Sequence, residues 1–259
     1  MSHDEATDDL ITSVDGGVLQ VTFNRPKQRN AMTWQMYQGL YDACERADQD
    51  ESIRVMVLRG AGGDAFVAGT DIGQFREFTG EDGVEYEGRI SRILGRLFAV
   101  NIPVVAVIDG FCIGGGLGIA AAADIRICRE SARFGVPIAR TLGNCLSTST
   151  LGALVRLIGQ SLTTDLLLTA RLMDAAEALR SGFVTAVADD LDAEAERLTG
   201  RLLGNAPLTM WATKESLRRL NAADSVDDDD IVSRIYGSND FAGAVDAFLS
   251  KAKPEWHGR

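Results

Sequence analysis

The segment IPVVAVIDGFCIGGGLGIAAAADIRI, residues 102–127, carries the strongest structural signal in this 259-residue chain. It contains an unbroken apolar run at 104–108, which is typical of a strand buried on both faces. A cluster of glycines follows at 114–118, and then an alanine-rich stretch that favours helix. A buried strand, a glycine-rich turn and a helix in this order predict parallel strands joined by helical crossovers.

The same order occurs earlier in the chain. VMVLRG at 55–60 is typical of a buried strand and leads into the glycine-rich AGGDAFVAGTD at 61–71. Residues 18–24 alternate apolar and polar side chains, as a half-buried strand does. Thr33 is a suitable N-cap for an amphipathic helix over 34–48. The expected fold class is therefore α/β.

Composition and charge restrict the partners. Hydrophobic residues make up 46% of the chain, enough for a substantial core. Acidic residues outnumber basic ones 37 to 26, giving a net charge of −11, whereas a nucleic-acid binder needs a basic face. No apolar run approaches the roughly 20 residues of a membrane span, and the acidic MSHDEATDD start is unlike a signal peptide. We expect a cytoplasmic protein without a nucleic-acid or membrane partner.

Histidine and cysteine usage restricts the chemistry. The two histidines, His3 and His257, lie near the chain ends, so a Ser-His or Cys-His pair has no base in the body of the protein. The four cysteines show no CxxC spacing, and we expect reduced residues that pack as small hydrophobes and no metal site. They are Cys44, Cys112, Cys128 and Cys145.

Two glycine-rich turns, VAGTDI at 67–72 and CIGGGLG at 112–118, each follow an expected strand and lead toward a helix. Glycine lets a backbone amide approach a ligand closely, and a helix start leaves amides unpaired. Two such amides can converge on one carbonyl oxygen and stabilise the charge that it gains in a reaction. Close packing of helix on strand is the alternative explanation. Neither turn fits a phosphate loop or a dinucleotide fingerprint.

Six segments, in order along the chain, resemble the crotonase, or enoyl-CoA hydratase/isomerase, superfamily. They are FNRPKQRNAM (23–32), AFVAGTDI (65–72), the segment at 102–127, SARFGVP (131–137), LTARLMDAAEALRSGFV (168–184) and NDFAGAVDAFLSKAKPEW (239–256). The resemblance runs from about residue 14 to the end of the chain. It implies a spiral of repeated ββα units over 1–195 and a C-terminal helical region over 196–259 that assembles homotrimers or hexamers. It also implies an acyl-CoA substrate, with coenzyme A as part of the substrate and no separate cofactor.

The resemblance assigns two oxyanion-hole amides, those of Thr70 and Gly115, which would polarise the thioester carbonyl and hold an enolate. Arg29 would be a phosphate ligand or a solvated surface charge. Phe248 and Lys251 would reach the adenine end of the coenzyme A of a neighbouring subunit. The CoA-binding residues that the resemblance implies are Gln28, Arg29, Met32, Ala68, Asp71, Ile72, Phe248 and Lys251.

The chain departs from the family at two acids. Hydratases of this family use two glutamates to position and activate water. By the resemblance, Gly118 stands at the first of these positions and Ile138 at the second. Neither side chain can transfer a proton, so the two-glutamate hydration mechanism is not expected, nor is the single-glutamate isomerase scheme in its usual form.

Gly118, Ile138, Arg140, Asn144 and Cys145 are the candidate acyl-pocket residues. Arg140 would recognise a carboxylate on the acyl group, or lie at a subunit interface. Cys145 would act as an acid or nucleophile, or be inert lining of the pocket.

A loosely patterned, charged stretch at 73–88 is interpreted as a mobile connection or partly helical lid. A helix is expected after it, at 90–100. The stretch contains Glu77, Glu85 and Glu87, which would either swing a carboxylate into the site or remain solvated.

The expected function is acyl-CoA chemistry through an oxyanion-stabilised enolate. Its reaction would be non-standard hydration or dehydration, double-bond isomerisation, decarboxylation, or cleavage of a thioester or C–C bond. The alternative is a catalytically silent acyl-CoA-binding or scaffolding homologue. RNA binding, a third hypothesis, is opposed by the charge of −11 and by the lack of a lysine-rich helix.

Overall fold

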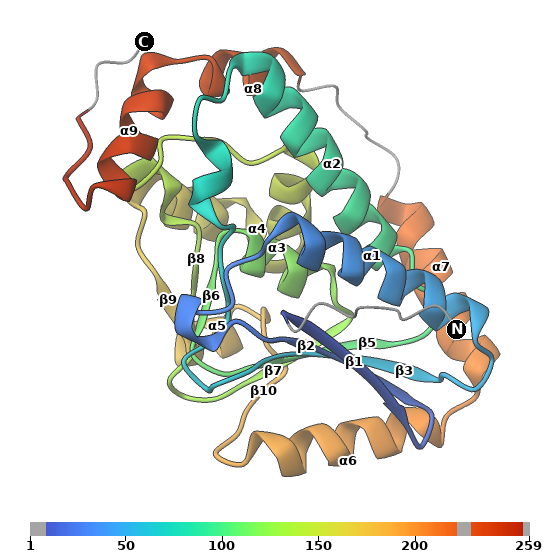
Figure 1. Cartoon of the computed structure of the whole chain (residues 1–259). Coiled ribbons are helices and arrows are strands. Elements are labelled where there is room, and N and C mark those ends of the chain that lie inside the picture. The colour runs from blue at the N-terminus through green and yellow to red at the C-terminus, as the bar shows by residue number, and fades with distance from the viewer. Residues whose placement is uncertain (1–8, 222–228, 256–259) are drawn as a thin grey trace.

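The computed structural model describes residues 9–221 and 229–255, which form two sheets surrounded by helices (Figure 1). The larger sheet contains, in spatial order, β1 (Leu10–Asp15), β2 (Val18–Phe23), β3 (Val55–Gly60), β5 (Val104–Ile108), β7 (Ile125–Cys128) and β10 (Ala186–Val187). The smaller sheet contains β4 (Ala65–Ala68), β6 (Phe111–Ile113), β8 (Arg133–Gly135) and β9 (Met173–Asp174). Strand pairs are parallel except for β1 with β2 and β8 with β9.

The helices follow the strands in a regular alternation. They are α1 (Trp34–Gln49), α2 (Gly80–Phe98), α3 (Gly115–Ala122), α4 (Thr148–Thr169), α5 (Ala175–Arg180), α6 (Leu191–Leu203), α7 (Pro207–Asn221), α8 (Asp229–Tyr236) and α9 (Asn239–Leu249). Short 3-10 turns lie at η1 (Pro26–Gln28), η2 (Ile72–Phe75) and η3 (Pro137–Arg140).

The repeating unit is two strands followed by a helix. In the units β3-β4-α2, β5-β6-α3 and β7-β8-α4, the first strand joins the larger sheet and the second joins the smaller one. The carboxyl ends of successive strands therefore lead into neighbouring turns, which is where ligands bind in sheets of this kind. The expected α/β spiral of ββα units with C-terminal helices is confirmed.

The larger sheet is covered on both faces. Met56 and Leu58 of β3 belong to the main core with α1 and α2, whereas Val55 and Val57 point to the other face and pack with Leu191 of α6. Figure 1 shows α6 alone beneath the sheet and α1 to α4 above it. Burial on both faces explains why the central strands are continuously apolar rather than alternating.

Helix α2 differs from the sequence expectation. It begins at Gly80, ten residues before the expected start at Ile90, so most of the stretch at 73–88 is helix, which agrees with the partly helical alternative rather than with a mobile connection. A capping box holds this start, because Thr79 accepts from the amide of Asp82 and the carboxylate of Asp82 accepts from the amide of Thr79. The helix turns its buried side toward the main core, and this side includes Glu87.

Helix α4 is long and apolar enough to cross a membrane by length and composition. Gly159, with φ 77° and ψ 157°, interrupts it, so it consists of two shorter helices rather than one continuous span. Ala153, Leu154 and Leu166 are buried in the fold. Burial in the protein core therefore explains part of the apolar composition of α4.

Replacing Gly116 tests the packing of α3 on β4. A Cβ at Gly116 would lie 2.1 Å from the carbonyl oxygen of Val67, which is backbone and cannot move aside cheaply. We expect Gly116→Ala to lower the free energy of unfolding by roughly 1–3 kcal/mol. The control is Gly95→Ala in α2, where a Cβ meets nothing within 4 Å and a stabilisation of up to about 1 kcal/mol is expected. Urea denaturation measures both, and equal effects would contradict the packing argument.

Candidate active site

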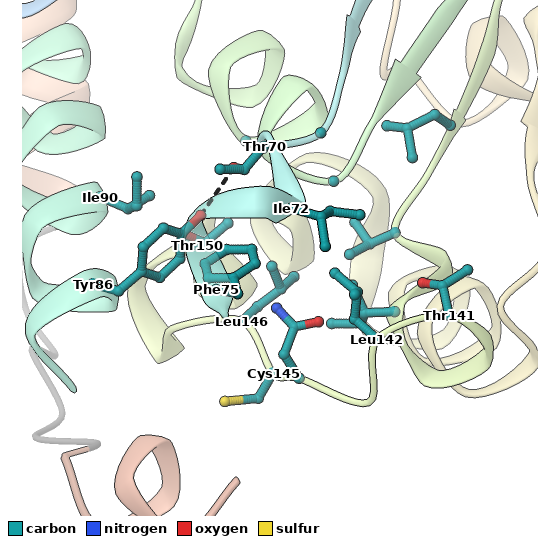
Figure 2. A pocket seen from close by; sticks show the side chains of 18 of the residues that line it. Thr70, Ile72, Phe75, Tyr86, Ile90, Thr141, Leu142, Cys145, Leu146 and Thr150 are labelled. Carbon is teal, nitrogen blue, oxygen red and sulfur yellow. Dashed lines mark hydrogen bonds between the residues drawn. The ribbon is translucent and has the colours of Figure 1, made fainter. Parts of the chain in front are cut away.

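A cavity of about 190 Å³ lies where the turn after β4 and the turn after β6 meet. Helix α2 forms one wall, and residues 136–146 form another. Figure 2 shows Tyr86 and Ile90 projecting from α2 on one side, with Ile72, Leu142 and Leu146 on the other. Most of the lining is aliphatic or aromatic, with few polar groups, as in many small-molecule sites.

The turns that carry Thr70 and Gly115 are in contact. Met32 bridges to Thr70 in parallel fashion, since its amide donates to the carbonyl of Gly69 and its carbonyl accepts from the amide of Asp71, both at 2.9 Å. In this pairing the amide of Thr70 itself points away from Met32. Gly115 lies nearby, because a Cβ built on it would be 3.4 Å from the hydroxyl oxygen of Thr70.

The amide of Gly115 is free to donate a hydrogen bond to a ligand for a different reason. Gly115 is the first residue of α3, and the first amides of a helix have no partner within it. Among the described residues, neither this amide nor that of Thr70 donates to another protein group. The cavity wall thus contains two backbone donors from separate turns.

Two tyrosine hydroxyl groups fix the Thr70 side chain. Its Oγ1 shares hydrogen bonds with the hydroxyl of Tyr37 at 2.8 Å and with that of Tyr86 at 2.9 Å, the second drawn in Figure 2. Burial raises the pKa of Tyr37 to about 12, and burial raises the pKa of Tyr86 well above its ordinary value. Both phenols therefore remain neutral near pH 7 and tie α1 and α2 to the turn at Thr70.

Glu87 lies in the cavity wall. Its side chain is on the inward face of α2 and is only 6% exposed. Oε1 accepts a hydrogen bond from the hydroxyl of Tyr236 at 2.7 Å, and Oε2 accepts one from the amide of Ser147 at 3.2 Å. Glu77 and Glu85 are exposed. Of the two alternatives for these glutamates, solvation is therefore wrong for Glu87.

Tyr236 connects Glu87 to Asn144 through hydrogen bonds. The pKa of Tyr236 is raised, first by burial and then by the negative charge of Glu87, so its hydroxyl stays protonated and donates. Asn144 Nδ2 donates to the same hydroxyl at 3.4 Å. Asn144 Oδ1 is buried and, within the described part of the chain, has no hydrogen-bond partner. An acceptor of this kind in a cavity wall can bind a water molecule or a donor on a ligand.

The structure brings four of the five candidate acyl-pocket residues together. Gly118, Ile138, Asn144 and Cys145 line the cavity. Arg140 is exposed and is not part of the wall, because it ends η3 with its side chain directed away from the core.

The expected CoA-binding residues separate into three groups. Ala68, Ile72 and Phe248 line the cavity. Phe248 lines the cavity of its own chain, and its approach to the coenzyme A of a neighbouring subunit stays a prediction of the family resemblance. Gln28 and Lys251 are exposed outside the cavity.

The other expected CoA-binding residues have contacts of their own. Met32 is 0% exposed, so it supports the turn at Thr70 through its backbone. Asp71 caps η2 and pairs with Arg25 at 3.2 Å. The exposed Arg29 places its guanidinium carbon 5.0 Å from the ring centre of Phe111.

The sequence expectations missed Tyr37, Tyr86 and Tyr236. Helical periodicity could have located Tyr86 and Glu87, because they continue the buried stripe of Ile90 and Leu97 back toward the start of α2. No local signal could have located Tyr236, whose place depends on how α8 packs on α2.

The part of the chain that the structure describes contains no histidine that could pair with a cysteine nucleophile. All four cysteines are free, and burial raises the pKa of Cys44 and Cys128 to about 12. Both histidines lie outside the described residues. In the described part of the chain, no group of three or more His, Cys, Asp or Glu side chains could hold a metal ion.

Alkaline pH tests the burial of Tyr37. Its pKa is about 12 in the folded chain and about 10 when unfolded, so only the unfolded state loses the proton between these values. The free energy of unfolding should fall as pH rises from about 10 to about 12, by roughly 1.4 kcal/mol per pH unit for one tyrosine. Urea denaturation of wild type and Tyr37→Phe at several pH values isolates this effect. Parallel pH profiles for the two proteins would contradict it.

Comparisons with known proteins agree with this geometry. Residues 13–259 match the family described as enoyl-CoA hydratase/isomerase. A short-chain-enoyl-CoA hydratase from Clostridium acetobutylicum is 31% identical over 253 residues, covering 95% of this chain and 96% of its own. An enoyl-CoA hydratase/carnithine racemase structure from Magnetospirillum magneticum shares 33% identity with a TM-score of 0.80, covering 98% and 97% of the two chains.

A methylmalonyl-CoA decarboxylase structure in complex with 2S-carboxypropyl-CoA shares the fold, with a TM-score of 0.88 at 24% identity over all of both chains. One family assignment follows from the fold, from the two adjoining turns and from the near full-length matches. This chain belongs to the enoyl-CoA hydratase/isomerase (crotonase) superfamily of acyl-CoA enzymes.

Proposed function

We propose that this enzyme polarises the thioester carbonyl of an acyl-CoA between the amides of Thr70 and Gly115 and forms an enolate there. The observation that carries the proposal is the convergence of two turns with unpaired amides on one cavity. Removing one donor of such a pair typically costs on the order of a hundred- to a thousand-fold in rate. The hydrogen bonds from Tyr37 and Tyr86 to Thr70 support the rigidity that this stabilisation requires.

The substrate would be a thioester of an uncharged acyl group. Among the described residues that line the cavity, Glu87 is the one whose side chain carries a formal charge. A carboxylate at the far end of the acyl chain would find no cation there and would be repelled by Glu87. The CoA arm would leave the cavity past Ala68, Ile72 and Phe248 toward exposed Gln28, Arg29 and Lys251.

The reaction would not follow the two-glutamate hydration scheme. Gly118 and Ile138, which the family resemblance places at the acid positions, both line the cavity and leave those parts of its wall without a carboxylate. Enolate formation followed by reprotonation, as in double-bond isomerisation, needs only one proton-transfer group and fits the site better. Cleavage of a thioester or C–C bond through the same enolate is the other reaction open to it, whereas decarboxylation would need a carboxylate on the acyl group, which Glu87 would repel.

The enzyme would act in the cytoplasm as a homotrimer or hexamer. Its division into a spiral over 1–195 and a helical assembly region over 196–259 is part of this proposal, although α6 crosses that boundary. Large apolar side chains exposed on α7 support assembly through this region. They are Leu208, Trp211, Leu217 and Leu220.

The Gly115 amide can be removed selectively. Proline is tolerated at the first position of a helix, where its missing N–H has no helical partner. A Cβ at Gly115 would lie 2.6 Å from the hydroxyl of Tyr37, so the test uses a Tyr37→Phe background. Gly115→Pro removes the donor, whereas Gly115→Ala keeps it and adds the same Cβ.

We expect bound 2,4-hexadienoyl-CoA, a conjugated thioester, to absorb at longer wavelength when its carbonyl is polarised. This red shift should persist in Tyr37→Phe and Tyr37→Phe/Gly115→Ala and largely disappear in Tyr37→Phe/Gly115→Pro. An unchanged shift in the proline variant would remove the Gly115 amide from the proposed role. Binding to wild type without any shift would favour the catalytically silent homologue.

Hydration of crotonyl-CoA should be slow. General acids and bases held in position typically accelerate a reaction on the order of a hundred- to ten-thousand-fold. We therefore expect the rate of crotonyl-CoA hydration to be lower by a factor of that order than the rate of the Clostridium hydratase assayed in parallel. Gly118→Glu with Ile138→Glu should raise hydration, whereas either change alone should not. A Cβ at Gly118 lies 3.1 Å from Leu94 Cδ1, so a side chain fits there if Leu94 shifts slightly. Turnover equal to the Clostridium enzyme would refute the argument.

A further inference from the structure

We propose that Glu87 is the proton-transfer carboxylate of this cavity, delivered from α2 instead of from the two positions held by Gly118 and Ile138. This inference rests on the proposed function, because the enolate that Glu87 would form is stabilised by the Thr70 and Gly115 amides. Three features of the structure support it: the close approach of α8 to α2, the hydrogen-bond donors to Glu87, and the acceptor on Asn144.

The first feature is the close approach of α8 to α2. A Cβ at Gly83, one turn before Glu87, would lie 2.0 Å from Tyr236 Cβ, so only glycine lets α8 come this near. The approach places the fully buried Tyr236 against the carboxylate. Tyr236 also packs edge-on or tilted against the rings of Phe75 and Tyr86, so the carboxylate has an apolar and rigid surrounding.

The second feature is the orientation of the carboxylate. The Tyr236 hydroxyl donates to Oε1 and the Ser147 amide to Oε2, and the two donors come from different elements, α8 and the N-cap of α4. Each oxygen accepts a hydrogen bond, an arrangement that stabilises the ionised form of a carboxylate. Ser147 is the N-cap of α4, so the carboxylate also lies near the amide end of a helix. Glu87 is thus held as a base at the cavity wall.

The third feature is Asn144. Its Nδ2 donates to the Tyr236 hydroxyl, which donates to Glu87, while its buried Oδ1 has no partner within the described residues. The open acceptor in the same wall as the carboxylate indicates that a donor, either water or a substrate group, completes the site.

The proposed step is a proton transfer. A Glu87 oxygen takes a proton from the acyl Cα, and the electron pair of the C–H bond moves into the bond between Cα and the carbonyl carbon. The carbonyl oxygen takes up the negative charge, stabilised by the amides of Thr70 and Gly115. Glu87 then returns the proton, either to Cα or, with a 3-enoyl thioester, to Cγ. Return to Cα regenerates the substrate, and return to Cγ gives the 2-enoyl isomer.

Hydrogen exchange in butyryl-CoA isolates this step, because a saturated acyl chain can be neither hydrated nor isomerised. In D₂O, wild type should incorporate deuterium at Cα, detected by mass spectrometry. Glu87→Gln keeps the shape of the side chain and should slow exchange by at least about 100-fold. The matched control is Glu85→Gln on the exposed side of the same helix, which should exchange within about twofold of wild type.

A second variant distinguishes catalysis from packing. Glu87→Ala removes the carboxylate, and added formate should restore part of the exchange by occupying the vacated space. Binding of 2,4-hexadienoyl-CoA, with its red shift, should persist in Glu87→Gln, because the oxyanion amides are untouched.

The outcomes separate the two proposals. Exchange in Glu87→Gln at the wild-type rate overturns the role of Glu87. The role of Glu87 is also overturned if the wild type binds 2,4-hexadienoyl-CoA with a red shift yet exchanges no hydrogen in butyryl-CoA. In that case the oxyanion proposal stands. Loss of binding and exchange together in both Glu87 variants, without rescue by formate, shows a structural clamp and also overturns the proposal. A wild type without binding or red shift overturns both proposals.

Discussion

The close contact between the turn after β4 and the start of α3 is the constraint on which the site depends. Gly116 lies so near the carbonyl of Val67 that no side chain fits between them. The same contact brings Gly115 beside Thr70, and both residues, which belong to different repeats of the spiral, line one cavity. The proposed use of their amides as an oxyanion hole would therefore depend on how two ββα units stack.

The polar groups around this contact connect distant segments. Tyr37 of α1 and Tyr86 of α2 bond the Thr70 hydroxyl, and Tyr236 of α8 bonds Glu87 of α2. Burying such groups is unfavourable unless they are hydrogen-bonded, so each one requires its partner to be in place. The N-terminal repeats and the C-terminal helices are thereby coupled at the cavity, and a change in either affects the other.

A carboxylate on α2 is also consistent with an apolar wall at Gly118 and Ile138. The family fold supplies the position of the carbonyl oxygen, whereas the acid-base group can come from any element that reaches the acyl carbons. In this chain α2 faces the cavity along most of its buried side, from Tyr86 to Leu94.

The sequence alone was sufficient for the α/β class, the family, the strands β2, β3 and β5, and the helix α1 with its Thr33 cap. These features depend on local patterns: apolar runs, glycine-rich turns and a capping side chain. The same patterns placed two glycine-rich turns at strand ends, and the family resemblance singled out Thr70 and Gly115 within them. They could not show that 73–88 is mostly helix, because charged residues obscure the short buried stripe at the start of α2.

Only the tertiary structure decided which polar side chains meet in the cavity. Glu87, Ser147 and Tyr236 are far apart in sequence, and their contacts follow from the packing of α8 on α2. Arg140 is a pocket candidate by its position in the chain, yet η3 directs it outward. A residue pattern specifies which face of its own element is buried, but the identity of the groups buried against that face depends on long-range packing.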